Sequence, residues 1–108
     1  MGKLSRSKGR RGETEAKHLL TDRDYTIVAD TSAGINSEDL IVADAEGKII
    51  SVEVKNRKLI DIQNFILQAR TNAKKYPWML LCKIAGTSSW LVMGKNIKPV
   101  IWHSKEKE

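Results

Sequence analysis

Residues 40–55 constrain the fold of this chain most strongly, because two apolar segments flank a short polar turn there. Residues 40–43 form the apolar run LIVA, residues 45–47 are Ala-Glu-Gly, and residues 48–55 have the alternating sequence KIISVEVK. Two apolar segments joined by a tight, glycine-containing turn predict an antiparallel hairpin. The fold must therefore include a β-sheet.

The second strand of this hairpin carries charges in a segment that otherwise looks like a core strand. Successive side chains of a strand point to opposite faces, so Glu53 and Lys55 share one face. Two explanations fit this pair: a structural ion pair, or a catalytic site in which the acid binds a metal ion. An ion pair on the surface contributes at most about 1 kcal/mol to stability.

Helices are predicted where apolar residues recur at helical spacing. The first covers residues 12–22, and the second covers residues 61–75 and is expected to be stopped by Pro77. The predicted strands are residues 25–29, 40–43, 48–55, 78–85, 90–94 and 100–102. Residues 30–37 are predicted to form a loop. The order α-β-β-β-α-β-β predicts an α/β fold in which helices flank a mixed sheet.

The length of 108 residues predicts a single domain, residues 1–108, with one core. Within it, residues 1–11 are expected to be a basic arm and residues 103–108 a frayed tail. The only cysteine, Cys82, excludes an intrachain disulfide and a multi-cysteine zinc site. With no secretory signal and no apolar run of roughly 20 residues, the sequence predicts a cytoplasmic protein.

The net charge of +6 is concentrated at the N-terminus. Residues 1–12 contain no acid and five cations, which are Lys3, Arg6, Lys8, Arg10 and Arg11. Such a block favours a polyanion, either nucleic acid or an anionic membrane surface, although a solvated tail has the same composition. Because no amphipathic membrane-binding helix accompanies it, nucleic acid is the favoured partner and a membrane is not expected.

Asp39 is placed to meet Glu53 across the predicted hairpin. Asp39 opens the first strand, and neighbouring strands lie about 5 Å apart, so the two carboxylates could converge at one end of the sheet. Two adjacent carboxylates repel each other unless a cation lies between them or one stays protonated. Mg²⁺ prefers such oxygen ligands, and Lys55 could act on the attacking water or on the developing charge.

Four segments resemble a known family in the same order. They are KGRRGETEAKHLLTDRDY, TSAGINSEDLIV, SVEVKNR and NFILQARTNAKKYPWMLLCKIAGTSSWLVM. Together they resemble the PD-(D/E)XK nuclease superfamily, and within it the small Holliday-junction resolvases of archaea and their viral and phage relatives. The resemblance covers residues 8–94. Glu38 stands where the superfamily has proline, and Asp24-Tyr25 stands where Gly-Phe is usual.

This resemblance implies a restriction-endonuclease-like core and a Mg²⁺-dependent endonuclease that resolves four-way DNA junctions by paired nicks, with Mn²⁺ as a substitute ion. It implies that Asp39, Glu53 and the carbonyl of Val54 hold the metal. Glu13, rather than Glu15, would complete the acidic cluster directly or through water. Lys55 would orient or activate the attacking water.

Two further catalytic roles come from the same resemblance, each beside a plainer explanation. Gln68 could reach the water or a DNA phosphate, or it could be a solvent-facing helical residue. Ser32 could contact the scissile phosphate, or it could be an ordinary loop serine. Which of Glu38 and Asp39 faces the metal also stays open, although Asp39 is favoured because it directly precedes the apolar strand.

The expected DNA-binding residues are the cations near the acidic cluster, namely Lys8, Arg10, Arg11, Lys58 and Lys83. A four-way junction has two-fold symmetry, so paired nicks require two active sites and hence a homodimer, for which the apolar segment from Trp90 to Trp102 is the candidate interface. No glycine-rich phosphate loop is present, so no nucleotide cofactor is expected. The alternatives are a nicking or restriction-like nuclease of the same fold, or a non-catalytic DNA-binding protein.

Overall fold

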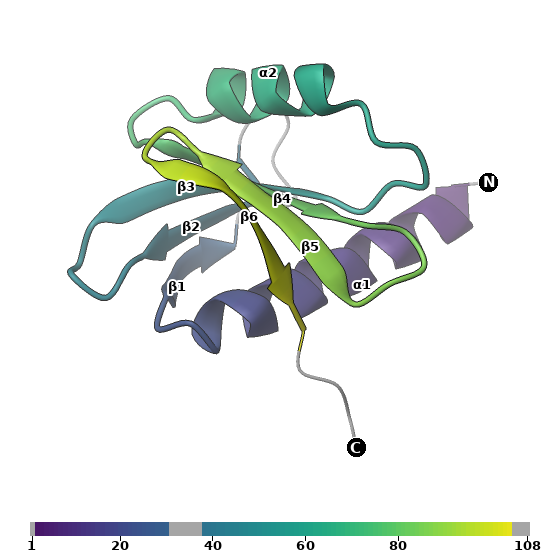
Figure 1. Ribbon diagram of the computed structural model, residues 1–108, viewed down its shortest axis with the longest axis horizontal. Helices are drawn as coiled ribbons and strands as arrows, with labels where there is room; N and C mark the ends of the chain where they lie inside the picture. The colour runs from purple at the N-terminus through teal and green to yellow at the C-terminus, as the bar shows by residue number, and fades with distance from the viewer. Residues whose placement is uncertain (1, 31–37, 105–108) are drawn as a thin grey trace.

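Six strands form one mixed sheet in the computed structural model, which describes residues 2–30 and 38–104 and the side chains from residue 12 onward. One helix covers each face of this sheet (Figure 1). In chain order the elements are α1 (Gly2–Thr21), β1 (Thr26–Asp30), β2 (Leu40–Ala43), β3 (Ile49–Lys55), α2 (Ile62–Asn72), β4 (Trp78–Lys83), β5 (Ser89–Gly94) and β6 (Ile97–His103). The prediction of an α/β fold with a mixed sheet is confirmed.

The strands lie in the sheet in the order in which they occur in the chain. All neighbouring pairs are antiparallel except β3 and β4, which are parallel. A parallel pair needs a long crossover connection, and α2 provides it. The predicted hairpin of β2 and β3 is present, with Leu40 paired to Val52 and Ala43 paired to Ile49.

The turn of this hairpin explains its register. The Asp44 carboxylate accepts hydrogen bonds from the backbone N–H groups of Glu46 and Lys48, both at 2.9 Å. Gly47 has a φ of +86°, a left-handed conformation that costs glycine little. This local geometry fixes which residues of β2 and β3 face each other.

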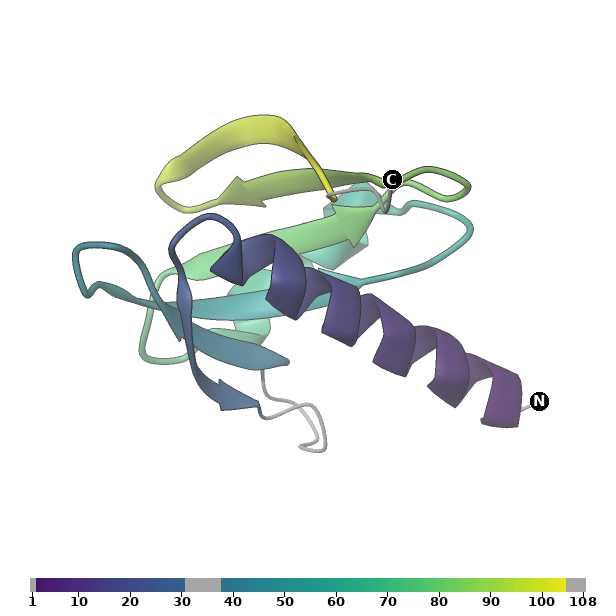
Figure 2. The same ribbon diagram turned by 90° about the horizontal axis from the view of Figure 1, so that it is seen from below.

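The core has two layers, one on each face of the sheet. Figure 2 shows α1 crossing one face, where Leu19 and Leu20 pack with Trp90 and the inward residues of β2 and β3. On the other face, Phe65 and Ala69 of α2 pack against β4. Residues of β4 alternate between these two layers, which explains why its sequence is continuously apolar.

Cys82 belongs to the α2 layer and is fully buried. Burial raises the pKa of its thiol, which keeps the sulfur protonated and unreactive.

Several predicted boundaries are wrong. The strand predicted at residues 78–85 ends at Lys83, and the strands predicted at residues 25–29, 48–55 and 90–94 differ by one residue. Three elements differ more. The first helix begins at Gly2 rather than at residue 12, so the backbone of the basic arm continues α1. The second helix ends at Asn72 rather than residue 75, because Ala73 is already extended, with a ψ of 90°; Pro77 therefore does not stop it. The last strand spans Ile97–His103 rather than residues 100–102.

The C-terminal boundary of the domain also changes. His103, predicted to lie in a frayed tail, ends β6, and its Nδ1 is 2.8 Å from the Ser89 hydroxyl. Asp30, predicted to lie in the loop, ends β1 instead. The remainder of that predicted loop, residues 31–37, and residues 105–108 of the predicted tail lie outside the described residues.

Neither described helix is both long enough and apolar enough to cross a membrane.

Candidate active site

Asp39 directly precedes β2 and lies beside Glu53 of the adjacent strand β3, as the hairpin predicts. Leu40 pairs with Val52, so the residue before Leu40 lies next to the residue after Val52. The Asp39 carboxylate accepts a hydrogen bond from the Val54 N–H at 2.8 Å, and the Asp39 N–H donates to the Val52 carbonyl at 2.9 Å. The Asp39 carboxylate therefore lies against the backbone of β3 and interacts electrostatically with Glu53.

The ionised form of Asp39 is disfavoured at this position. Burial raises its pKa to about 7, and the charges of Glu53 and Glu13 act in the same direction, against the opposing effects of the Val54 N–H and Lys55. Three acidic side chains thus interact electrostatically at one place. A positive charge brought to this place would stabilise the Asp39 carboxylate.

Glu53 and Lys55 form a buried ion pair rather than a surface pair. Glu53 is only 6% exposed and Lys55 only 8%. The Lys55 Nζ lies 3.4 Å from one carboxylate oxygen of Glu53, and the Asn72 side-chain amide donates to the other at 3.2 Å. The Lys55 Nζ also lies 5.4 Å from the centre of the Phe65 ring. Because buried charges lose their hydration, such partners offset part of the cost of burying the pair.

Helix α1 reaches this site through a close contact at Gly12. A Cβ atom added to Gly12 would lie 2.7 Å from the Cβ of Asn56, the residue directly after β3. Only a glycine allows the helix to come this close, and the contact brings the neighbouring Glu13 within electrostatic range of Asp39. Glu15 instead pairs with Lys83, whose Nζ lies 2.6 Å from its carboxylate. The two glutamates of α1 thus differ in their surroundings: Glu13 interacts electrostatically with Asp39, whereas Glu15 is paired with Lys83.

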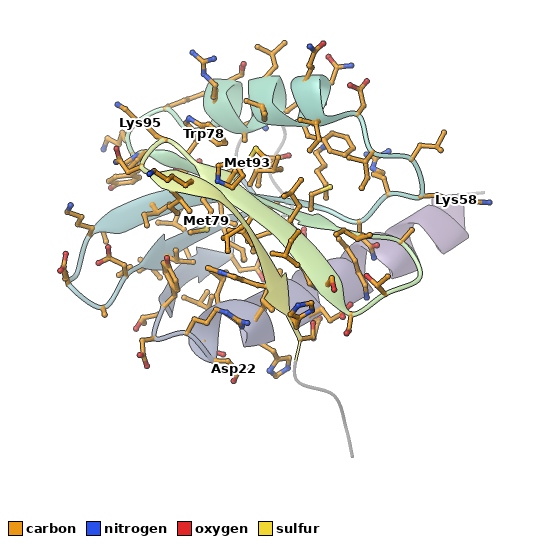
Figure 3. All side chains as sticks on the ribbon, viewed as in Figure 1. Asp22, Lys58, Trp78, Met79, Met93 and Lys95 are labelled. Carbon is orange, nitrogen blue, oxygen red and sulfur yellow. The ribbon has the colours of Figure 1, made fainter. Side chains whose placement is uncertain are left out.

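The other predicted site residues are not gathered at this cluster. Gln68 is exposed on α2, and it makes no hydrogen bond with the described residues of the cluster. Lys58 is exposed in the segment between β3 and α2, at the edge of the molecule seen in Figure 3. Lys83 is half-buried, paired with Glu15 and 5.9 Å from the Trp90 ring, so it is not a free cation for DNA.

Several predictions fall on residues without a described side chain. Ser32 lies outside the described residues. Lys8, Arg10 and Arg11 belong to the helix α1, but their side chains are outside the described part.

Sequence reasoning missed Asn72 and the contact of Gly12 with Asn56. Asn72 follows Gln68 by one helical turn, so a search of that helical face would have included it. The Gly12 contact joins segments that are distant in the sequence, and no local pattern marks it.

Within the described ranges, no three His, Cys, Asp or Glu side chains are placed to hold a metal ion together. The carboxylates of Asp39 and Glu53, with Glu13 nearby, are the candidate metal donors among these residues.

No protein-family model, curated protein or solved structure matches this chain. Its function must therefore be argued from its own residues.

Proposed function

We propose that this protein is a Mg²⁺-dependent endonuclease that hydrolyses phosphodiester bonds of branched DNA, with the four-way junction as its substrate. The observation that carries the proposal is the convergence of Asp39 and Glu53 beside Lys55 at one position of the sheet. Two carboxylates can hold a divalent ion that assists phosphodiester hydrolysis, and a lysine beside them can stabilise the developing charge.

The donors fit Mg²⁺ or Mn²⁺. Both ions prefer oxygen ligands, and Mg²⁺ commonly uses one or two carboxylates and completes its shell with water and substrate phosphate. Asp39 and Glu53 would hold the ion, with the Val54 carbonyl as a further donor and Glu13 acting directly or through water. The raised pKa of Asp39 supports this, because a divalent cation would compensate the excess negative charge. A bound Mg²⁺ would polarise a phosphoryl oxygen and acidify a water molecule.

The remaining residues would orient the reacting groups. Lys55 has its ammonium group beside Glu53, so it can donate a hydrogen bond to the attacking water or stabilise the charge that develops on the phosphate. Asn72 holds the second oxygen of Glu53 and so fixes the direction of that carboxylate. Asn72 is thus a positioning residue in this proposal.

The charge of the chain supports a nucleic-acid substrate. The net charge is +6 with a pI of about 9.6, and the most basic segment is part of the same helix that carries Glu13. Cations near a phosphodiester-cleaving site attract the DNA backbone and make binding salt-sensitive. We include Lys8, Arg10, Arg11 and Lys58 among the proposed DNA contacts and leave out Lys83.

Symmetric cleavage of a junction needs two active sites, so we propose that the protein acts as a homodimer. The proposed interface changes from the one expected from the sequence. Trp90 is fully buried in the α1 layer and cannot be part of it, whereas Val100 and Ile101 of β6 are 41% and 43% exposed. In the described sheet, β6 is an edge strand.

The test is the cleavage of a labelled four-way junction beside a linear duplex, in Mg²⁺ and in EDTA. We expect paired nicks that are confined to the junction, require Mg²⁺ and disappear in Glu53→Gln. The matched control is Glu46→Gln, which removes an exposed acid in the β2–β3 turn and should leave cleavage unchanged. Equal cutting of both substrates would exclude junction selectivity. Binding without cutting in Mg²⁺ or Mn²⁺ would show a DNA-binding protein instead.

A further inference from the structure

A pocket of about 590 Å³ opens between the C-terminal part of α2 and the turn that joins β5 to β6. We name it the α2 pocket. Its lining includes four cations and two aromatic residues, which are Arg70, Lys74, Lys75, Lys95, Tyr76 and Trp78. Among the residues that the structure describes, no acidic side chain lines the α2 pocket. Figure 3 shows Trp78 and Lys95 on the side of the molecule opposite Lys58.

The backbone forms the wall of the α2 pocket. The Lys95 N–H donates a hydrogen bond to the Trp78 carbonyl at 3.1 Å. A Cβ atom added to Gly94 would lie 2.7 Å from the same carbonyl oxygen, so only glycine allows the turn to approach β4 this closely. The relative positions of Trp78 and Lys95 are therefore set by the sheet itself, which makes the pocket a preformed feature.

The four cations of the α2 pocket are exposed, and none of them has an ion-pair partner among the residues that the structure describes. Other cations of the chain differ in this respect. Lys17 pairs with Asp30, and Lys55 and Lys83 each pair with a glutamate. A concave surface with several uncompensated positive charges concentrates its field and attracts a polyanion.

We propose that the α2 pocket binds an unpaired strand of nucleic acid. Phosphates would meet the four cations, and a base would stack on Trp78 or Tyr76. Aromatic side chains combined with a basic groove are the features by which proteins hold single strands, because every base has a face that can stack. The volume lies in the range of pockets that enclose a small organic group such as a nucleotide. The bases of an intact duplex are stacked on one another and are not free to enter.

The α2 pocket adjoins the candidate active site along α2. Asn72, which binds Glu53, lies in the chain between Arg70 and Lys74 of the pocket. Trp78 pairs with Ser51, which precedes Glu53 by two residues, a separation of about 7 Å along the strand. The inference rests on the proposed function for its choice of DNA as the polymer. It adds a feature of that substrate: an unpaired stretch near the cut, as in a four-way junction whose central base pairs have opened.

The binding test uses the full chain in EDTA, so that no cleavage takes place. Affinity for a fluorescent oligothymidylate is measured by anisotropy over a range of salt concentrations, with a duplex of equal length beside it. We expect Lys74→Gln with Lys95→Gln to weaken single-strand binding about tenfold or more. The salt slope should fall by about 1.4, because each phosphate contact of a single strand contributes about 0.7. The matched control, Arg57→Gln with Lys98→Gln, removes two exposed cations that do not line the α2 pocket and should leave that slope unchanged.

A second measurement tests the stacking. Oligothymidylate should quench part of the tryptophan fluorescence in the native protein, and Trp78→Phe should remove that quenching while retaining most of the affinity. Equal weakening of single-strand binding by the pocket variant and by the control variant, or an equal loss of duplex binding, would overturn the proposal. Quenching that persists in Trp78→Phe would also overturn it. Single-strand binding that follows these rules in a protein without nuclease activity would reject the proposed function and keep this inference.

Discussion

Asp39 determines the chemistry of the site more than any other single residue. It is anchored by the Val54 N–H, turned toward Glu53 and raised in pKa to about 7 by burial and by neighbouring acids. A carboxylate with a raised pKa destabilises the folded protein when it is ionised, and such groups are concentrated at functional sites. The nearby Lys55 is more deeply buried than Asp39, and its ammonium group pairs with Glu53.

The raised pKa of Asp39 predicts how the stability of the metal-free protein changes with pH. In the unfolded chain this carboxyl group has a pKa of about 3.9, so between about pH 4 and 7 only the folded state retains the proton. The free energy of unfolding should therefore fall as the pH rises through this window and level off above it. Asp39→Asn should be more stable than the native protein at about pH 8, by on the order of 2 kcal/mol, and similar to it near pH 4.

Urea unfolding at several pH values in EDTA measures this difference. Mg²⁺ should stabilise the native protein at high pH and have less effect on Asp39→Asn. A difference between the two proteins that stays constant from about pH 4 to 8 would contradict the assignment.

The pair of Glu53 and Lys55 predicts non-additive effects on stability. Lys55→Met leaves the buried carboxylate of Glu53 without its cation, so it should cost on the order of 3 kcal/mol in the free energy of unfolding. Adding Glu53→Gln should cost less than the sum of the two single changes, because the double variant has no unpaired charge. Urea denaturation of the four proteins measures this, and strictly additive costs would indicate that the two side chains do not interact.

Among the elements, α1 links the core to the site. Leu19 and Leu20 near its C-terminal end anchor it in the core, while Gly12 allows it to touch Asn56 and to bring Glu13 toward Asp39. The position of one acidic residue thus depends on a contact between two elements.

Gly12→Ala tests this contact. Alanine is the better helix former by about 1 kcal/mol, yet its Cβ would meet the Cβ of Asn56, which cannot move away easily. We expect a net loss of about 1 kcal/mol in stability and slower cleavage of DNA, since the helix must shift. Asn56→Gly in the same chain removes the obstructing atom and should restore part of both. A more stable and equally active Gly12→Ala protein would disprove the role given to the contact.

The elements also show which structural features the sequence can predict. The β2–β3 hairpin was predictable because Asp44 and Gly47 form a local turn, and this turn alone places Asp39 near Glu53. The end of α2 at Asn72 was not predictable, because the apolar spacing continues to Ala73, where the backbone is already extended. The bond from Asn72 to Glu53 depends on how α2 packs on β3, which no pattern within either segment specifies.

As a whole molecule, the protein has both faces of its sheet covered, while β6 remains at an edge. Exposed apolar residues on an edge strand favour association with another strand. Val100 and Ile101 are such residues, and pairing two copies through β6 would give the two active sites that a symmetric junction needs.

Light scattering at micromolar concentration tests the dimer. The native protein should have about twice the chain mass of 12.2 kDa, and Ile101→Lys should reduce it toward that mass. The control Leu67→Lys changes an equally large apolar residue, 59% exposed on α2, and should leave the dimer intact. A native mass of a single chain would end the dimer proposal.

The most direct test of the metal-dependent site compares two adjacent acids. Single-turnover cleavage of a four-way junction in Mg²⁺ is measured for the native protein, Asp39→Asn and Glu38→Gln. The Asp39 carboxylate interacts with Glu53 and is a proposed metal ligand, whereas Glu38 has no role in the proposed site. Asp39→Asn should therefore lose cleavage by at least about a hundredfold while Glu38→Gln keeps it within a few fold. Equal activity of Asp39→Asn and the native protein, or a loss confined to Glu38→Gln, would contradict the site described here.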